Sequence, residues 1–362
     1  MGKTYRVALI GCGGIARLHA RSMANLPEVN LVALADIRPE ASEQFGDAYN
    51  IPSDKRYADY TELLDAVPPD IAIVATRADT HAEISIAALS RGINVLCEKP
   101  IAVDLLEADA MTEASERSGA KLAINTQRHT DPVFLHAKQL ASDGTIGELR
   151  AIRSECKLYT AAVGMMNIGS HFFDAMNLIA GAPRWVYANL TTHSGEPVTV
   201  DDVTTGDRGT GLAVGDIGTV VIGYDGGVTG VSEYWEGVGT YGFEVVGTKA
   251  VLAIRGTDPV LYRTTGGGGK VNDPIEWNAI EVSLSDSDRR IFDENRWGTQ
   301  FMMRDLIRAI EKNERPSCSG YDGRAAMEIN HAAFVSARSG TRVELPLKNR
   351  EHPLKLWMRD SS

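Results

Sequence analysis

Short apolar runs alternate with amphipathic segments through the first third of the chain. The runs end at glycine, aspartate or proline, which is typical of buried strands. Strands are predicted at residues 6–11, 30–36, 70–76, 94–100 and 121–127. Helical periodicity lies between and after them, at residues 15–26, 39–49, 80–92 and 104–118. Because these strands are apolar on both faces, the pattern predicts a doubly wound parallel sheet covered by helices on both sides.

The pattern changes near residue 149, where longer alternating runs are separated by hairpin turns. YDGG at 224–227 lies between two such runs and is a strong hairpin signal. About six antiparallel strands are predicted within 149–159, 184–193, 218–235, 242–255 and 259–265. Helices are expected at 165–180, at 297–313 and within 320–340. The second part is therefore predicted to be an α+β domain, which gives domains 1–126 and 127–362.

Length and charge narrow the possible functions. At roughly 150 residues per domain, 362 residues suggest two domains. The net charge of −11 disfavours sequence-independent nucleic-acid binding, which needs a basic surface. No apolar run approaches the ~20 residues of a membrane helix. The run VALI near the N-terminus is too short for a signal-peptide core, so a cytoplasmic protein is expected.

No metal or phosphate-loop motif is convincing. The four cysteines are widely spaced and match no zinc pattern, so reduced thiols are expected. Asp201 and Asp202 are interpreted as loop acids, and no metal site is predicted. TTGGGGK at 264–270 lacks the Ser or Thr that follows the lysine of a phosphate loop, so a hairpin loop is expected there.

The link between the first strand and the first helix reads GCGGIA. Gly11 would form the tight turn, Gly13 would let the backbone approach a pyrophosphate, and Ala16 would allow close helix packing. Asp36 ends the second strand, where a carboxylate can bind a ribose 2′-hydroxyl and repel a 2′-phosphate. This favours NAD, although Arg38 could hold the phosphate of NADP. The alternative is a tight turn with a solvated aspartate.

Two further residues are ambiguous on their own. Lys99 in CEKP lies at the carboxyl end of the fourth strand, the edge where open parallel sheets bind ligands. Its ammonium could stabilise an alkoxide, or it could be an ordinary surface lysine. His171, in MMNIGSHFFDAM, could be a satisfied core histidine or could face a substrate.

In combination, these motifs resemble the glucose–fructose oxidoreductase / inositol dehydrogenase family, Gfo/Idh/MocA. The resemblance rests on GCGGIA, Asp36, CEKP, NIGSHFFD and the closing VELPLKNREHPLKLW. It implies a Rossmann domain joined to a domain with a large open antiparallel sheet. It also implies homodimers or homotetramers formed through that sheet. The implied activity is NAD(P)-linked oxidation or reduction of a sugar, cyclitol or related polyol.

The resemblance also assigns catalytic roles. Lys99 matches the family lysine and His171 the family histidine, whereas Asn167 stands where relatives often have an aspartate. An amide cannot exchange a proton at neutral pH but can still bind a hydroxyl. On a regular helix, residues 167, 171 and 174 share one face, which we expect to be directed toward the Rossmann sheet edge. His171 is then expected to accept the hydroxyl proton while Lys99 stabilises the oxyanion.

The remaining site residues are weaker candidates. His81 could line the nicotinamide site or simply begin a helix, and Arg128 could bind a ligand or tie the domains together. Tyr159, Trp235 and Trp297 could stack on a sugar ring, although aromatic residues more often lie in a core. The expected cofactor-binding residues are Gly11, Gly13, Gly14, Ile15, Asp36, Arg38, Thr76, His81, Glu98, Lys99 and Arg128. The expected substrate-binding residues are Lys99, Tyr159, Asn167, His171 and Trp235.

Two other functions remain open at this stage. A redox-neutral enzyme could oxidise a glycoside transiently, eliminate the aglycone and reduce the product again. A non-catalytic NAD-binding regulator is the third possibility, and it would need neither Lys99 nor His171. Net NADH formation from a simple polyol would distinguish an NAD-dependent dehydrogenase from both of these alternatives.

Overall fold

The computed structural model describes residues 3–255, 260–265, 276–286, 288–290 and 298–361. Its internal contacts divide the chain into two units, here called units 1 and 2. Unit 1 comprises residues 1–127 and 297–324, and unit 2 comprises residues 128–296 and 325–362. Trp297 and residues 266–270 of the TTGGGGK segment lie outside the described residues.

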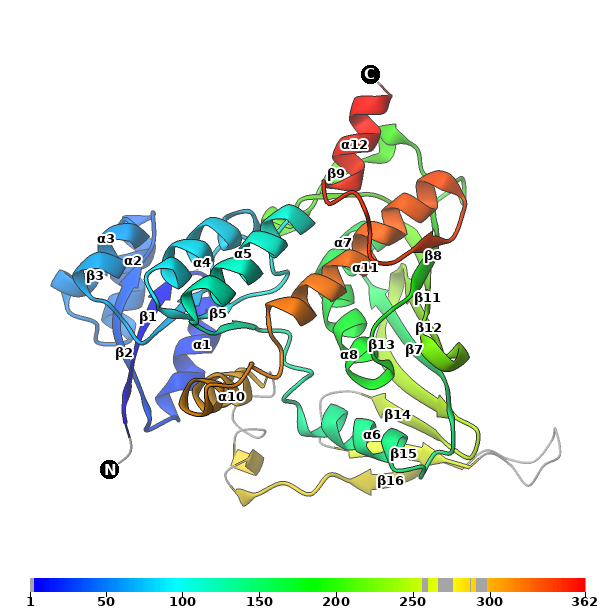
Figure 1. Cartoon of the computed structure of the whole chain (residues 1–362), viewed down its shortest axis with the longest axis horizontal. Helices are drawn as coiled ribbons and strands as arrows, with labels where there is room; N and C mark the ends of the chain where they lie inside the picture. The colour runs from blue at the N-terminus through cyan, green and yellow to red at the C-terminus, as the bar shows by residue number, and fades with distance from the viewer. Residues whose placement is uncertain (1–2, 256–259, 266–275, 287, 291–297, 362) are drawn as a thin grey trace. The chain divides into compact units, whose positions relative to one another are not determined.

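Unit 1 is built on a six-stranded parallel sheet with the order β3-β2-β1-β4-β5-β6 (Figure 1). The sheet comprises β1 Tyr5–Ile10, β2 Val29–Ala35, β3 Arg56–Tyr57, β4 Ile71–Val74, β5 Asn94–Cys97 and β6 Leu122–Ile124. Five of these strands correspond to the predicted apolar runs, while the short edge strand β3 was not expected. The order reverses at β1, which places the glycine-rich loop at the switch point of the sheet.

The helices that connect these strands are α1 Gly14–Ala24, α2 Pro39–Ala48, α3 Tyr60–Ala66, α4 His81–Ser90 and α5 Leu105–Ser118. The alternating pattern predicts all of them except the short α3. Unit 1 also contains α10 Thr299–Lys312. Helix α10 comes from far along the sequence and packs on α1 and β5 (Figure 1). It had been expected in the second domain. Its amphipathic sequence predicts that one face is buried but does not identify the elements that cover this face. Its position in the sequence alone therefore suggests the wrong domain.

Unit 2 contains a nine-stranded sheet with the order β16-β15-β14-β13-β7-β12-β11-β8-β17. Its strands are β7 Leu149–Leu158, β8 Trp185–Thr191, β11 Ile217–Gly223, β12 Thr229–Tyr234, β13 Glu236–Gly247, β14 Val251–Arg255, β15 Val260–Thr264, β16 Asn278–Glu281 and β17 Val343–Glu344. A separate small ribbon pairs β9 Thr204–Thr205 with β10 Leu212–Ala213. The YDGG turn joins β11 and β12 as predicted.

The large, mainly antiparallel sheet expected for the second domain is confirmed, and it contains one parallel pair of strands. Strands β7 and β12 run parallel, with Ser154 opposite Ser232. The chain passes through two α-helices and the four strands β8 to β11 between β7 and β12, so no hairpin forces them to be antiparallel.

The helix predicted over 165–180 is longer and irregular. It consists of α7 Ala161–Gly164, a π-helical turn Met165–Gly169 and α8 Ser170–Ala180. The other helices of unit 2 are α6 Pro132–Ser142 and α12 Pro353–Asp360, while α11 Gly320–Ser339 continues from unit 1 into unit 2. Helix α6 packs against β13 and β15, and α8 packs against β7.

All four cysteines are buried free thiols. In the described part of the chain, no helix is both long enough and apolar enough to traverse a bilayer.

Candidate active site

The glycine-rich loop has the geometry that its sequence predicts. Gly11 has a φ of +94°, and a Cβ there would lie 2.6 Å from the Ala75 carbonyl oxygen. Only glycine therefore fits this turn without strain. A Cβ on Gly13 or Gly14 would meet none of the described residues within 4 Å, so the space beside their backbone is open.

The N-terminus of α1 supplies donors to this open space. No side chain caps the helix, and its first turn contains no acidic residue. The first amide groups of a helix have no partner within it, and the helix dipole favours an anion there. The loop and the helix N-terminus together fit a pyrophosphate.

Asp36 follows β2 at the same edge of the sheet. Its carboxylate accepts hydrogen bonds from the Cys12 amide at 2.8 Å and from the Arg38 amide at 2.8 Å. The Arg38 guanidinium adds contacts of 3.1 and 3.2 Å. Burial by itself would raise the pKa of the Asp36 carboxyl, but the hydrogen bonds from Arg38 and Cys12 outweigh it and lower this pKa. Asp36 is thus a fixed carboxylate beside the glycine-rich loop.

Lys99 follows β5, and its peptide bond with Pro100 is cis. The preceding Glu98 is buried, and its carboxylate accepts a hydrogen bond from the Lys99 amide at 3.2 Å. Since β1, β2 and β5 are parallel, Lys99 lies on the same sheet edge as the glycine-rich loop and Asp36.

The other sequence candidates in unit 1 are directed differently. His81, at the start of α4, is buried, and its ring nitrogens lie 2.9 Å from the Pro100 oxygen and 3.4 Å from the Thr76 oxygen. Burial lowers the pKa of His81, so its ring is neutral at pH 7. The hydroxyl of Thr76 accepts a hydrogen bond from Thr80 at 2.8 Å. Ile15, in the first turn of α1, is exposed.

In unit 2, His171 lies on α8 and Asn167 in the preceding π-helical turn. His171 is 9% exposed, whereas Asn167 is half-buried. The π turn widens the helix, so the regular spacing expected between residues 167 and 171 does not apply across it. Gly169 allows this turn to pack closely, because a Cβ there would lie 2.7 Å from the Tyr234 hydroxyl. Single π turns are frequent at functional sites.

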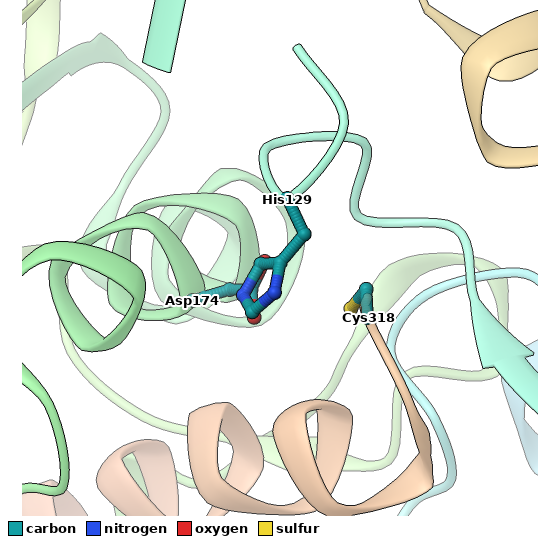
Figure 2. Close-up of side chains that lie close together, drawn as sticks. All are labelled: His129, Asp174 and Cys318. Carbon is teal, nitrogen blue, oxygen red and sulfur yellow. The ribbon is translucent and has the colours of Figure 1, made fainter. Parts of the chain in front are cut away.

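Asp174, one turn after His171, is fully buried. The imidazole of His129 lies beside it, with Nε2 2.9 Å from Oδ1 (Figure 2). His129 is also buried, so the pair ties the segment before α6 to α8. The H-x-x-D spacing marks Asp174 in the sequence, but nothing there points to His129.

The remaining candidates of unit 2 lie in varied surroundings. The Arg128 guanidinium lies 4.8 Å above the Phe134 ring and 3.4 Å from the Asp131 carboxylate, at the start of α6. Tyr159 is exposed, and Trp235 is half-buried with the Lys157 ammonium 4.8 Å from its ring. An exposed aromatic face suits a sugar ring, and Tyr159 offers one.

Two buried polar residues of unit 1 were missed by the sequence reasoning. His19 and Asn125 both donate to the Glu98 carboxylate, at 2.8 and 2.6 Å. His19 shares the buried face of α1 with Ala16, Ala20 and Met23. A histidine on a face made otherwise of small or apolar residues and Ser22 is the signal that could have identified it.

The comparisons with known proteins agree with this geometry. Residues 5–126 match an oxidoreductase family with an NAD-binding Rossmann fold, and residues 134–253 match the C-terminal domain of the same family, GFO/IDH/MocA. The chain belongs to this family. The resemblance, the Rossmann fold and the NAD-binding oxidoreductase class expected from the motifs are therefore confirmed.

Relatives within GFO/IDH/MocA extend over nearly the whole chain. The D-apiose dehydrogenase of Paraburkholderia graminis is 25% identical, with 97% of this chain and 92% of that protein covered. The myo-inositol 2-dehydrogenase of Thermotoga maritima is also 25% identical, with 94% of this chain and 98% of that protein covered. The structure of a levoglucosan dehydrogenase with NADH and levoglucosan has a TM-score of 0.77 at 19% identity, covers 95% of this chain and 100% of that one, and shows the shared fold.

Proposed function

We propose that this protein is an NAD-dependent dehydrogenase that oxidises a hydroxyl carbon of a sugar, cyclitol or related polyol, or reduces the corresponding carbonyl. The observation that carries the proposal is the placement of Lys99 on the sheet edge that also holds the glycine-rich loop and Asp36. The relatives named as apiose and myo-inositol dehydrogenases support the substrate class.

The cofactor site is proposed along this edge. Gly11, Gly13 and Gly14, with the first turn of α1, would hold the pyrophosphate, and Ile15 would lie against the cofactor. Asp36 would bind the adenosine ribose, and Thr76 would line the edge. When bound, NAD supplies the hydride acceptor of the reaction.

The chain's own residues would handle the proton and the charge. We assign His171 as the base that accepts the hydroxyl proton, because an imidazole titrates near neutral pH. Lys99 would stabilise the negative charge that develops on the oxygen. Asn167 would hydrogen-bond a neighbouring hydroxyl without exchanging a proton, and Tyr159 and Trp235 would provide apolar faces to the ring.

The test is a panel of aldoses, cyclitols and glycosides, assayed with NAD and NADP in parallel by nicotinamide absorbance. The proposal expects net NADH formation from at least one free sugar or cyclitol. Breakdown of a glycoside without net NADH would instead indicate a redox-neutral enzyme. Binding of NAD without turnover of any compound would indicate a regulator.

The protein is further proposed to form homodimers or homotetramers through one face of the nine-stranded sheet. Tyr187, Val221 and Val231 are cross-strand neighbours and lie on the same face. Tyr187 is 41% exposed, and the two valines are half-buried. An apolar row of this kind on a sheet surface favours association. The cytoplasmic location expected from the sequence stays a prediction.

A further inference from the structure

A buried polar cluster lies directly behind Lys99. Glu98 is only 5% exposed. Its Oε1 accepts hydrogen bonds from His19 Nε2 at 2.8 Å and from Asn125 Nδ2 at 2.6 Å. Its Oε2 accepts the amide of Lys99 at 3.2 Å. The cluster thus connects α1 and the end of β6 to the residue that precedes Lys99.

The Glu98 carboxylate is ionised despite its burial. Burial alone would raise its pKa, but the hydrogen bond and charge interaction with His19, the hydrogen bond from Asn125 and the charge of Lys99 lower that pKa to about 2. His19 Nδ1 is buried and has no hydrogen-bond partner among the described residues. His19 therefore makes its hydrogen bond through Nε2, to the Glu98 carboxylate.

A second imidazole supports the other side of Lys99. His81 Nδ1 lies 2.9 Å from the Pro100 carbonyl oxygen, which requires the proton on this nitrogen. The ring comes from α4, on a different part of the sheet from His19 on α1. Two buried histidines from separate helices therefore hold the residues on either side of Lys99.

We propose that His19, Asn125 and His81 are positioning residues that fix the turn Glu98–Lys99–Pro100 and with it the position of the Lys99 side chain. His19 and Asn125 hold Glu98 on one side of Lys99, and His81 holds the Pro100 carbonyl on the other side. This inference rests on the proposed role of Lys99 in stabilising the oxyanion.

Two other titratable groups near the turn are uncharged at neutral pH. Cys97 is fully buried, and burial raises the pKa of its thiol. His81 is neutral because burial lowers its pKa. Asp79, which interacts with His81, forms an exposed pair with Arg77 at 2.9 Å. The ionised group within the turn that accepts the hydrogen bonds is therefore the Glu98 carboxylate.

The test compares His19→Leu with His19→Gln in the full-length protein. Leucine removes the donor to Glu98, whereas the glutamine amide can restore a donor close to the position of Nε2. The first readout is trace acetylation with acetic anhydride over a pH series, in which mass spectrometry follows Lys99 against the exposed Lys138 as reference. This readout needs neither substrate nor activity. The second readout is kcat together with the dissociation constant of NAD.

In His19→Leu, we expect the labelling rate of Lys99 relative to that of Lys138 to rise by about threefold or more, because a turn that is no longer fixed exposes the amine more often. We also expect kcat to fall by about tenfold or more, because a small misplacement of a catalytic group lowers the rate strongly. The affinity for NAD should stay within about threefold, and His19→Gln should recover most of both changes. Unchanged labelling and unchanged kcat in a folded His19→Leu protein would overturn the proposal.

Glu98→Gln provides the second variant if His19→Leu does not fold. It preserves side-chain volume but replaces the carboxylate that accepts from His19 and Asn125, so the labelling rate of Lys99 relative to Lys138 must again change, and an unchanged rate contradicts the inference. The two proposals can fail separately. A changed labelling rate in the variants of a protein whose wild type oxidises no compound of the panel would refute the proposed function alone.

Discussion

At the scale of single residues, Asp36 and Arg38 determine the expected cofactor preference. The side chain of Asp36 is 6% exposed, whereas that of Arg38 is 61% exposed. The carboxylate is therefore the fixed member of the pair and Arg38 the adaptable one. The negative charge of Asp36 would repel a 2′-phosphate, although Arg38 beside it is cationic.

Replacing Asp36 should relax this preference. In Asp36→Ser, we expect the ratio of kcat/KM for NAD to that for NADP to fall by about tenfold or more, because the repulsion is lost and Arg38 can bind the phosphate. Asp65→Ser, which removes a more exposed carboxylate paired with Arg91, is the matched control and should leave the ratio unchanged. The same ratio in Asp36→Ser and wild type would refute the assignment.

The contribution of Glu98 to the free energy of unfolding depends on pH. Its pKa is about 2 in the folded chain, below the ordinary value of 4.5. The unfolded chain therefore binds the proton first as the pH falls, so the contribution is complete above pH 4.5 and is lost progressively toward pH 2. It amounts to roughly 3 kcal/mol at most.

Urea unfolding over this pH range tests the contribution. The difference in unfolding free energy between wild type and Glu98→Gln should narrow as the pH falls from about 4.5 to about 2. Comparing the two proteins cancels the other acidic groups. A difference that does not vary with pH would show that Glu98 has an ordinary pKa.

Sequence reasoning at this scale found residues that belong to local motifs. Lys99, Asp36 and His171 each stand at a position that a strand end or a short motif marks. His19, Asn125 and His129 were not found, because their significance lies in contacts with residues far along the chain. Such pairing depends on the packing of α1, β6 and α8, which a single sequence does not specify.

At the scale of elements, the glycine-rich loop separates a folding role from a binding role. Gly11 has positive φ and faces the Ala75 carbonyl oxygen, whereas Gly13 is an ordinary extended residue beside open space. The first glycine is required by the turn itself. The second is required only if another molecule lies against the backbone.

The two alanine substitutions should therefore behave differently. Gly13→Ala should leave the thermal unfolding temperature nearly unchanged while weakening NAD binding by about tenfold or more, because the methyl group would occupy the cofactor's space. Gly11→Ala should lower the unfolding temperature clearly, because both backbone and Ala75 oppose it. NAD affinity unaffected by Gly13→Ala in a folded protein would contradict the proposed pyrophosphate site.

The prediction of a regular helix was wrong where a π-helical turn interrupts the α-helix. The segment 165–180 was predicted as one regular helix, but residues 165–169 form a π turn. Hydrophobic periodicity averages over several turns and does not reveal a local widening. Gly169 was the available signal, since a glycine within a helix often marks a close approach, here to Tyr234.

At the scale of the whole molecule, local patterns identified two kinds of sheet but not every pairing within them. Alternation and turn residues predicted the β11–β12 hairpin, whose strands are adjacent in sequence. The parallel contact of β7 with β12 and the packing of α10 in unit 1 join distant segments. The apolar faces of these elements require partners, and several partners would satisfy them equally well.

The exposed sheet face leads to a prediction about assembly. We expect light scattering to give the mass of a dimer or tetramer for the wild type and a smaller mass for Val221→Glu, since a charge in the apolar row would oppose burial. Lys138→Glu on α6 is the control and should keep the wild-type mass. A monomeric wild type at micromolar concentration would refute this assembly.

The central claim is that Lys99 and His171 carry out the proton and charge chemistry of an NAD-linked dehydrogenase. The most direct measurement is the rate of NADH formation by wild type, Lys99→Met and His171→Ala at saturating NAD with the best substrate of the panel. Control variants Lys138→Met and His193→Ala change residues of the same types that lie on the surface. The account predicts that turnover falls by about 100-fold or more in each site variant while NAD still binds. Turnover close to that of the wild type in His171→Ala would contradict it.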